Sequence, residues 1–220
     1  MRKSVYSLVL MDDVVAAIDR LAYEQNTSRS NLINQILAER VSYVTPEMRM
    51  RDIFDQLEGI LSDSCYQIQN QASDSMFSVR SSLQYKYRPT VKYQIELFRE
   101  PKDIAGRLKV TFRTSSQNFA SAVEQFFSYW MQIENAYLLN VHPDGVPSEL
   151  DGGKFIRGFL ELTGDHKLSE EDIANAIGEY IKVLDACLKY YFENITDAEK
   201  WKMQMESAYR AYLQSGVYIA

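Results

Sequence analysis

Thiol and imidazole side chains, which often serve as nucleophiles, bases and metal ligands, are few in this 220-residue chain. Cys65 and Cys187 stand alone without the spacing of a zinc site, so we expect two buried, reduced thiols. His142 and His166 each lie in a turn, with no serine or cysteine set beside them as a nucleophile. The Asp-Gly-Gly-Lys string at residues 151–154 lacks the full glycine pattern and the Lys-Ser/Thr ending of a phosphate loop. We therefore predict no catalytic residue, no metal site and no cofactor, and we do not expect an enzyme.

Basic and hydroxyl side chains alternate with apolar ones between residues 76 and 113, where the period of two predicts strands. One parity is apolar and should face a core: Val79, Leu83, Tyr85, Tyr87, Val91, Tyr93, Ile95, Leu97, Leu108, Val110 and Phe112. The other parity collects the cations Arg80, Lys86, Arg88, Lys92, Arg107, Lys109 and Arg113. That face suits an anion such as a phosphate backbone, a nucleotide or an acidic partner, with five candidate ligands. These are Arg80, Lys86, Lys92, Lys109 and Arg113. The alternative is a solvated sheet face whose cations prevent edge pairing and meet acidic helices of the same chain.

The first forty residues combine one short alternating segment with two compact helical patterns. Residues 4–10 alternate and predict one strand, with Val5, Ser7 and Val9 on the side opposite Tyr6, Leu8 and Leu10. Helical spacing begins at Asp12 and should end near Gln25, because Asn26 tolerates the left-handed conformation that closes a helix. Ser28 is a good N-cap for a second helix, which carries Leu32, Ile33, Ile36 and Leu37 on one face. A lone strand with two short helices cannot bury its apolar faces or pair its edges, so we predict a homodimer.

This pattern resembles the ribbon-helix-helix superfamily of Arc, MetJ and CopG over about residues 3–44. The resemblance is carried by the strings LMDDVVAAIDRLA at residues 10–22, NTSRS at residues 26–30 and NLI at residues 31–33. It implies that a ribbon of one strand from each of two subunits lies in the major groove of double-stranded DNA. It further implies groove-facing positions at Lys3, Val5, Ser7 and Val9, and phosphate contacts at Ser28, Arg29 and Ser30.

The groove-facing positions depart from the family in one respect, because only Lys3 and Ser7 are polar. Valine can touch a thymine methyl group but cannot distinguish hydrogen-bond donors from acceptors on the bases. We therefore expect base readout that is weak, biased to A·T pairs, or moved onto Arg2, Lys3 and the shape of the DNA. Replacing Ser7 should change the preferred sequence, whereas replacing Arg29 or Ser30 should weaken binding to every sequence.

Net charge is −6, but it is divided unevenly along the chain. Residues 1–51 hold seven Lys or Arg against six Asp or Glu, and residues 78–113 hold nine against three. Residues 52–77 hold none against five, and residues 114–220 hold eight against sixteen. The acidity thus lies outside the first segment and does not argue against DNA as a partner. No apolar run approaches membrane-spanning length and no signal peptide is evident, so we expect a cytoplasmic protein without a membrane partner.

We predict an α+β chain with two domains, divided between Val41 and Pro46: the ribbon-helix-helix module at residues 1–44 and a larger domain at residues 45–220. Thr45 and Pro46 should begin a helix that packs through Ile53, Phe54, Leu57, Ile60 and Leu61. An antiparallel sheet at residues 65–113 should contain strands at residues 66–69, 76–88, 90–98 and 107–113. Helices should fill residues 115–215. Their predicted starts are Ser115 and Ser116, Lys154 (for a short helix to residue 162), Ser169 and a capping box beginning at Thr196.

The leading hypothesis is a homodimeric transcriptional regulator, acting as a repressor, whose C-terminal domain binds an anionic effector or a protein partner. One alternative is a plasmid or DNA-segregation adaptor that coats tandem sites and recruits another protein. A second alternative is an interaction protein that uses the N-terminal module only to dimerise, which the apolar outward positions Val5 and Val9 permit.

Overall fold

The computed structural model describes residues 5–62, 65–73, 75–86, 88–99, 104–113, 116–160, 168–216 and 219. Over these residues the protein is mixed α+β, with six helices and one six-stranded antiparallel sheet. The helices are α1 (Asp12–Glu24), α2 (Arg29–Arg40), α3 (Pro46–Ser62), α4 (Gln117–Leu138), α5 (Glu170–Glu193) and α6 (Ala198–Gln214). The strands are β1 (Gln67–Ser73), β2 (Met76–Ser82), β3 (Thr90–Leu97), β4 (Ile104–Arg113), β5 (Ser148–Asp151) and β6 (Lys154–Leu160).

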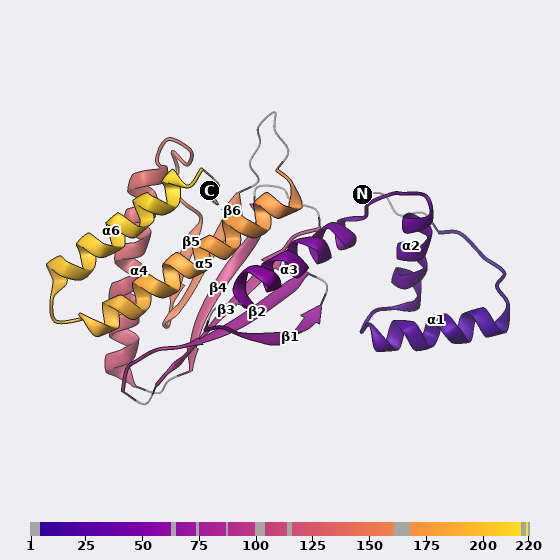
Figure 1. Ribbon diagram of the computed structural model, residues 1–220, viewed down its shortest axis with the longest axis horizontal. Coiled ribbons are helices and arrows are strands. Elements are labelled where there is room, and N and C mark those ends of the chain that lie inside the picture. The colour runs from indigo at the N-terminus through magenta and orange to yellow at the C-terminus, as the bar shows by residue number, and fades with distance from the viewer. Residues whose placement is uncertain are drawn as a thin grey trace.

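Helices α1 and α2 form where local signals predict them. The chain leaves α1 through Asn26, which takes a left-handed φ of 49°. The Ser28 Oγ atom then accepts a hydrogen bond from the Asn31 backbone N–H at 3.2 Å and caps α2. Figure 1 shows this helix pair standing apart from the rest of the protein, to which residues 41–45 connect it.

The strand predicted over residues 4–10 is wrong for the single chain. Residues 5–11 have no regular secondary structure, and Ser4 lies outside the described residues. A strand exists through hydrogen bonds to a neighbouring strand, and no described strand lies beside this segment. The period of two alone therefore does not produce a strand here, and pairing of this segment with a second chain stays a prediction.

Helix α3 begins as predicted, because the Thr45 Oγ1 atom accepts a hydrogen bond from the Met48 backbone N–H at 3.2 Å and Pro46 takes the first helical position. Its apolar stripe faces the sheet, and the rings of Phe54 and Phe77 stack at 5.8 Å. The predicted packing of Ile53, Phe54, Leu57 and Leu61 is confirmed, with Ile60 partly buried beside them.

The sheet has the strand order β1-β2-β3-β4-β6-β5, and most predicted strands need adjusted ends. β1 runs on to Ser73, beyond the predicted end at residue 69, and β3 ends at Leu97, one residue before its predicted end. β2 stops at Ser82 instead of residue 88, since the Leu83 N–H donates to the Pro89 carbonyl oxygen and closes a loop there.

The strand β4 begins three residues earlier than predicted, at Ile104. The pairing of β4 with β6 is irregular between Ile104 and Gly106. A Cβ atom at Gly106 would lie 2.5 Å from the Glu96 carbonyl oxygen, so this close approach between backbones requires glycine. Of the predicted turn at residues 100–106, residues 100–103 lie outside the described part of the chain.

The short helix predicted from Lys154 to residue 162 is wrong, because β5 and β6 form a hairpin that extends the sheet. Gly152 and Gly153 connect the two strands with φ angles of 55° and 76°, the pair of positive values that a two-residue type I′ turn needs. Phe155 and Phe159 face the core on alternate positions. The residue between them on the same side is Arg157, whose charge hides the apolar alternation of a strand.

Three helices enclose the remaining core. α4 starts after its cap Ser116 and α5 after Ser169, as predicted. The capping box predicted at Thr196 is found instead at the start of α5, between Ser169 and Asp172. Ser115 lies outside the described residues. α6 is capped by Asp197, whose side chain accepts from the Lys200 N–H, so the predicted start at Thr196 is one residue too early.

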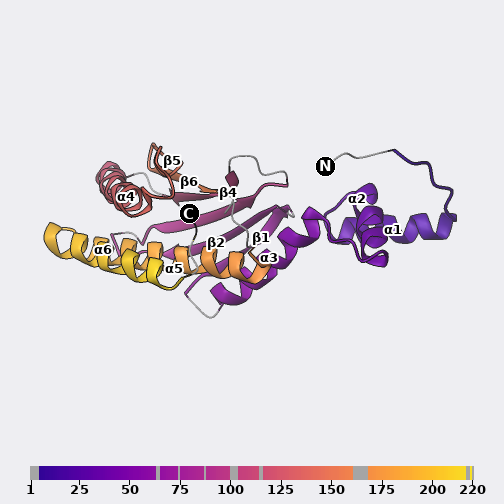
Figure 2. The same ribbon diagram turned by 90° about the horizontal axis from the view of Figure 1, so that it is seen from above.

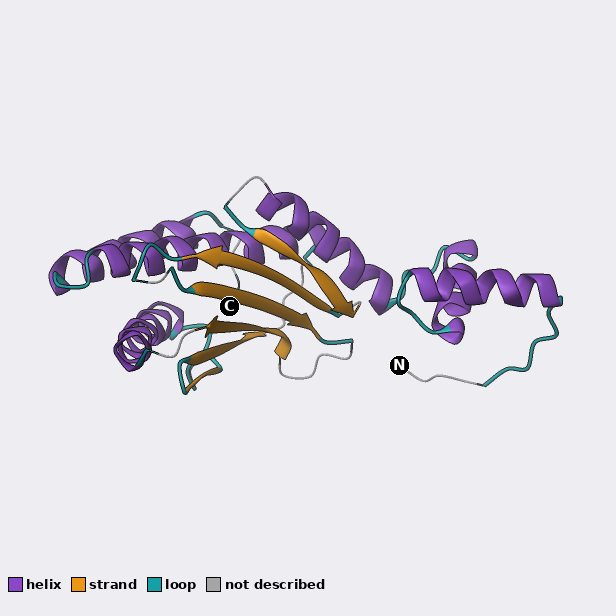
Figure 3. Cartoon of the chain, turned by 90° about the horizontal axis from the view of Figure 1, so that it is seen from below, coloured by secondary structure: helices purple, strands orange, loops and turns teal. Residues whose placement is uncertain are grey.

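Helices α3, α4 and α5 pack on one face of the sheet, and α6 packs on α4 and α5. Phe77 meets α3, and Tyr93 donates to Asp185 of α5. Phe155 stacks on Phe127 of α4 at 4.4 Å. Figures 2 and 3 show α5 and α6 along one side of the twisted strands, with α4 beside the β5–β6 end. The opposite face of the sheet carries no described helix. None of the helices that the structure describes is long and apolar enough to cross a membrane.

Candidate nucleic-acid interface

The turn between α1 and α2 is fixed by its own side chains. The Asn31 side-chain amide donates to the Thr27 Oγ1 atom at 3.3 Å, while its backbone N–H is capped by Ser28. Ser28 and Ser30 are exposed at the start of α2, where unpaired backbone N–H groups and the helix dipole favour an anion. The turn thus places two of the three predicted phosphate contacts on an open helix N-terminus.

Arg29, the third predicted phosphate contact, is held by a residue that the sequence did not single out. Its guanidinium donates from Nε and Nη2 to the two carboxylate oxygens of Asp19 on α1. The hydrogen bond from Arg29 lowers the pKa of Asp19, and the same bond raises the pKa of Arg29. Both side chains are about half exposed, at 54% for Arg29 and 45% for Asp19. A phosphate at this turn would therefore compete with Asp19 for the guanidinium.

The predicted groove-facing residues lie in the unpaired segment before α1. Val5 and Val9 are fully exposed and Ser7 is exposed between them, whereas Lys3 and Arg2 lie outside the described residues. Tyr6 and Leu8, predicted to face the other way into a core, are also exposed. The single chain therefore brings these side chains to no common surface.

Residues 5–44 bury very little apolar surface. Among them the buried apolar side chains are Ala22, Leu32 and Ala38. Large apolar side chains are exposed on both helices and before them: Leu8, Leu10, Met11, Val14, Leu21, Ile36 and Leu37. This amount of exposed apolar surface makes residues 5–44 a candidate interaction surface.

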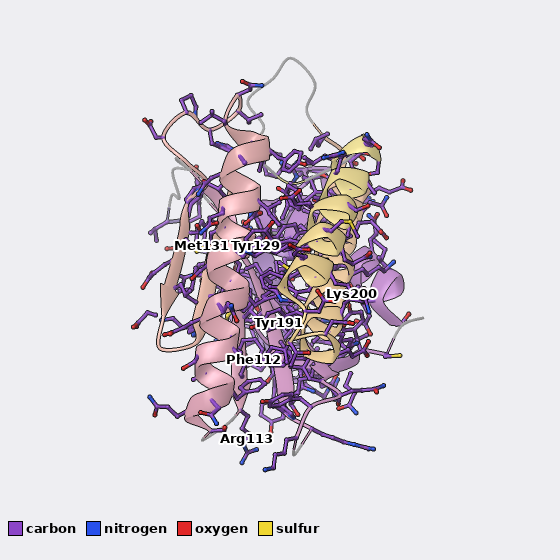
Figure 4. The ribbon with its side chains drawn as sticks, turned by 90° about the vertical axis from the view of Figure 1, so that its left-hand side faces the viewer. Phe112, Arg113, Tyr129, Met131, Tyr191 and Lys200 are labelled. Carbon is purple, nitrogen blue, oxygen red and sulfur yellow. The ribbon has the colours of Figure 1, made fainter. Side chains whose placement is uncertain are left out.

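The structure places four of the five predicted anion ligands, Arg80, Lys92, Lys109 and Arg113, on one face of the sheet, while anion binding there stays a prediction. Arg80 and Lys92 are direct neighbours on β2 and β3, and Gln94 is the neighbour of Lys109 on β4. Arg113 lies at the end of β4; Figure 4 shows its side chain pointing away from the helices, while Phe112 lies among the packed side chains. Lys86 and Arg88 lie beyond the end of β2 and are exposed, whereas Tyr87 is outside the described residues.

A buried ion pair on the core side was missed by the sequence analysis. Arg157 and Glu134 have no exposed side-chain surface, and Arg157 Nε donates to Glu134 Oε1 at 3.0 Å. The Tyr180 hydroxyl donates to the same oxygen at 3.0 Å, and Trp130 Nε1 donates to Tyr180. Burial raises the pKa of Glu134, which Arg157 opposes. The available signal was the charged residue at an inward position of the 154–160 segment.

A second buried carboxylate lies under the sheet at Asp185. It accepts from Ser81 Oγ at 3.1 Å and from the Tyr93 hydroxyl at 2.8 Å, and it pairs with Lys189 at 2.7 Å. Burial raises the pKa of Tyr93 well above its ordinary value, so the phenol remains a donor. Each carboxylate oxygen thus has a partner, and the arrangement ties α5 to β2 and β3.

The predicted burial of both thiols holds for Cys187 and fails for Cys65, which is exposed just before β1. His142 lies in a turn, as predicted. Its side chain is buried, and burial lowers its pKa. His166 lies outside the described residues. A pocket of about 220 Å³ lies between the end of β4, the first turns of α4 and the Gly152–Gly153 turn. None of its lining side chains is titratable.

The chain matches no protein-family model, no curated protein and no solved structure. Its own residues are therefore the basis for inferring its function. Within the described ranges, no cluster of three or more His, Cys, Asp or Glu side chains could hold a metal ion. Two surfaces remain as candidates for binding: the N-terminal helix pair with its unpaired segment, and the basic outer face of the sheet.

Proposed function

We propose that the protein is a homodimeric, sequence-specific DNA-binding regulator of the ribbon-helix-helix type, acting in the cytoplasm as a transcriptional repressor. Its N-terminal residues 1–44 dimerise and bind the major groove. The C-terminal domain at residues 45–220 then serves as the binding domain for an effector or a protein partner.

The observation that carries this proposal is the exposed apolar surface of the N-terminal module beside a segment with unsatisfied strand pairing. Leu8 and Leu10 lie before α1, Leu21 lies on α1, and Ile36 and Leu37 lie on α2, all exposed in the single chain. A second copy related by two-fold symmetry would pair residues 4–10 of both chains and cover these side chains together. Burying a fully exposed large apolar side chain contributes about 1.5–3 kcal/mol, and these five, which are 40–59% exposed, would each contribute part of that to dimerisation.

The helix start at Ser28 supports DNA as the ligand of that dimer. Ser28 and Ser30 are exposed beside the first-turn N–H groups of α2, and Arg29 adds a cation at the same place. In a two-fold dimer this arrangement occurs twice, flanking the paired strands, which is the relation that phosphates on either side of a groove require.

The test is selection of bound duplexes from a random DNA pool by the purified full chain, at low and at moderate salt. We expect an enriched pseudo-palindrome or tandem repeat. Ser7→Ala should change the enriched sequence. Arg29→Ala should weaken binding to all sequences and leave the enriched sequence unchanged. Ser128→Ala serves as the matched control, because Ser128 is an exposed serine on α4, far from the module in sequence.

Two outcomes would overturn the proposal. If Ser7→Ala and Arg29→Ala bind and select DNA as the unmodified protein does, the assigned contacts are wrong. If no sequence is enriched at any salt concentration while the protein is dimeric, the module serves only dimerisation, an interpretation that the apolar side chains of Val5 and Val9 favour. Coating of tandem sites together with capture of a protein would instead indicate a segregation adaptor.

A further inference from the structure

The outer face of strands β2, β3 and β4 is strongly basic. Strand alternation and the pairing register place twelve side chains on it: Met76, Ser78, Arg80, Ser82, Thr90, Lys92, Gln94, Glu96, Arg107, Lys109, Thr111 and Arg113. Five of these are cations, one is a carboxylate, and none of the twelve is buried. The remaining positions are mostly hydroxyls and an amide, which are groups that also donate to phosphate oxygens.

Four of the five cations have no ion-pair partner within the described ranges. Arg107 pairs with the face's carboxylate, Glu96, at 2.7 Å. No ion pair engages Arg80, Lys92, Lys109 or Arg113 among the residues that the structure describes. We call the surface formed by these four cations the basic face.

The acidic part of the chain does not neutralise the basic face. The carboxylates of residues 114–220 outnumber the cations sixteen to eight, and many of them lie on α5 and α6. Those helices cover the opposite face of the sheet, where Asp185 bonds to Tyr93. Among the described residues the charges are therefore separated across the sheet, and the basic face is left open to an external anion.

The side chains on the face indicate which polyanion fits. No aromatic residue occupies any of the twelve outward positions, and Tyr93 points into the core. Single-stranded nucleic acids are held largely by bases stacked on aromatic side chains, which this face does not offer. Cations with hydroxyl and amide groups suit the phosphate backbone of a duplex, which carries regularly spaced charges and presents no exposed base faces.

We propose that the outer face of the sheet binds the phosphate backbone of duplex DNA without reading its sequence, through Arg80, Lys92, Lys109 and Arg113. The inference rests on the proposed function for the identity of the polymer, and it adds a second contact on the same chain. The N-terminal module selects the site, and the basic face holds DNA that flanks it. Because both contacts belong to one protein, the second forms at high effective concentration.

The experiment compares the full chain with R80Q/K92Q/K109Q/R113Q and with the matched control K182Q/K200Q/K202Q/R210Q. The control removes four cations from α5 and α6, so both variants change the net charge of −6 by the same amount. Binding to a random-sequence duplex is followed by fluorescence anisotropy over a salt series. Each phosphate contact contributes about 0.9 to the slope of log affinity against log salt, so losing all four lowers the slope by about 3 to 4. The control should keep the unmodified slope and affinity.

Circular dichroism and thermal melting establish that both variants remain folded. An unchanged slope in the sheet variant, or an equal loss in the control, would overturn the proposal. A sheet variant that loses self-association and keeps its DNA binding would mean that the acidic surface of a second copy covers the face. The Ser7→Ala selection separates the two proposals. An enriched sequence that Ser7→Ala leaves unchanged, with the sheet contribution intact, would overturn only the module's role. A sequence preference that Ser7→Ala changes, with an unchanged salt slope in the sheet variant, would overturn only the sheet's role.

Discussion

At the scale of single residues, the most consequential interaction is the buried ion pair of Arg157 and Glu134. Arg157 also donates to the carbonyl oxygens of Gly158 and Ile219, at 3.1 Å and 3.3 Å. Its guanidinium therefore joins β6, α4 and the region after α6 at one point. The energetic value of such a pair comes mainly from the cost of breaking it, since desolvation offsets most of its attraction.

Arg157→Met should lower the free energy of unfolding by about 3–5 kcal/mol, because it leaves the Glu134 carboxylate buried without its cation. Glu134→Met/Arg157→Met should recover a large part of that loss, since it removes both charges and fills similar volume. Urea denaturation of the two variants and the unmodified protein measures both changes. An Arg157→Met variant within about 1 kcal/mol of the unmodified protein would contradict the assigned role, because surface substitutions scatter on nearly that scale.

Residue-scale features were predictable where their cause is local. Asn26 and Ser28 act through atoms one to three positions away, so a single sequence contains their whole explanation. Arg157 and Asp19 were missed because their partners lie far along the chain, at Glu134 and Arg29. The residues next to Arg157 in the sequence do not indicate that its partner is a carboxylate on α4.

At the scale of elements, the close contact of α3 and α5 depends on one glycine. A Cβ atom at Gly178 of α5 would lie 2.7 Å from Ile60 Cγ2 and 3.3 Å from Leu57 Cδ1 on α3. The absence of a side chain allows the two helices to pack closely over the β1–β2 side of the sheet. Gly59, on α3 itself, has open space around its Cα atom and is exposed.

Gly178→Ala and Gly59→Ala should change stability in opposite directions. Overpacking at Gly178 should cost about 1–3 kcal/mol, because Ile60 must move or the helices must separate. Alanine at Gly59 should stabilise the protein by up to about 1 kcal/mol, since it favours the helix and meets nothing. Thermal unfolding of the two single variants provides the comparison. Equal effects at the two positions would show that helix propensity dominates and that the α3–α5 contact is loose.

Elements were predicted best where a cap and a periodic stripe agree, as in α3 and α5, with Thr45 and Ser169 at their starts. The β5–β6 hairpin was missed although Gly152 and Gly153 carry a hairpin signal. Arg157 interrupts the apolar alternation of residues 154–160, so the segment was predicted to be a helix instead of a strand. The charge of Arg157 can be buried there because Glu134 pairs with it. The strand predicted at residues 4–10 is absent from the single chain, because no described strand lies beside residues 5–10 to pair with them.

At the scale of the whole molecule, the two parts differ in how they are stabilised. A continuous core extends from α3 to α6, whereas residues 5–44 bury the apolar side chains of Ala22, Leu32 and Ala38 alone. The α+β class was predictable from the change between periods along the chain, whereas the boundary placed between Val41 and Pro46 stays a prediction. The alternation of apolar residues also predicted which face of the sheet the helices cover. It did not predict the number of strands.

Unfolding should therefore occur in two steps that respond differently to protein concentration. The N-terminal module, if it is stabilised by a second copy, should unfold at a temperature that rises with concentration, because association stabilises by mass action. The C-terminal domain should unfold at a temperature independent of concentration. Scanning calorimetry at two concentrations tests this. Ile36→Lys, which places a charge on the exposed apolar surface of α2, should affect only the first step. A single transition that ignores concentration would argue against dimerisation.

The exposed thiol of Cys65 is a natural site for attaching a fluorescent label. Burial raises the pKa of Cys187 to about 12, so at neutral pH a thiol-directed fluorophore should attach to Cys65 alone. Cys65 lies just before β1, whose residue Gln67 is the neighbour of Arg80 on β2. A dye at Cys65 would thus sit at the rim of the basic face without any substitution, and its emission would report the arrival of DNA there in real time.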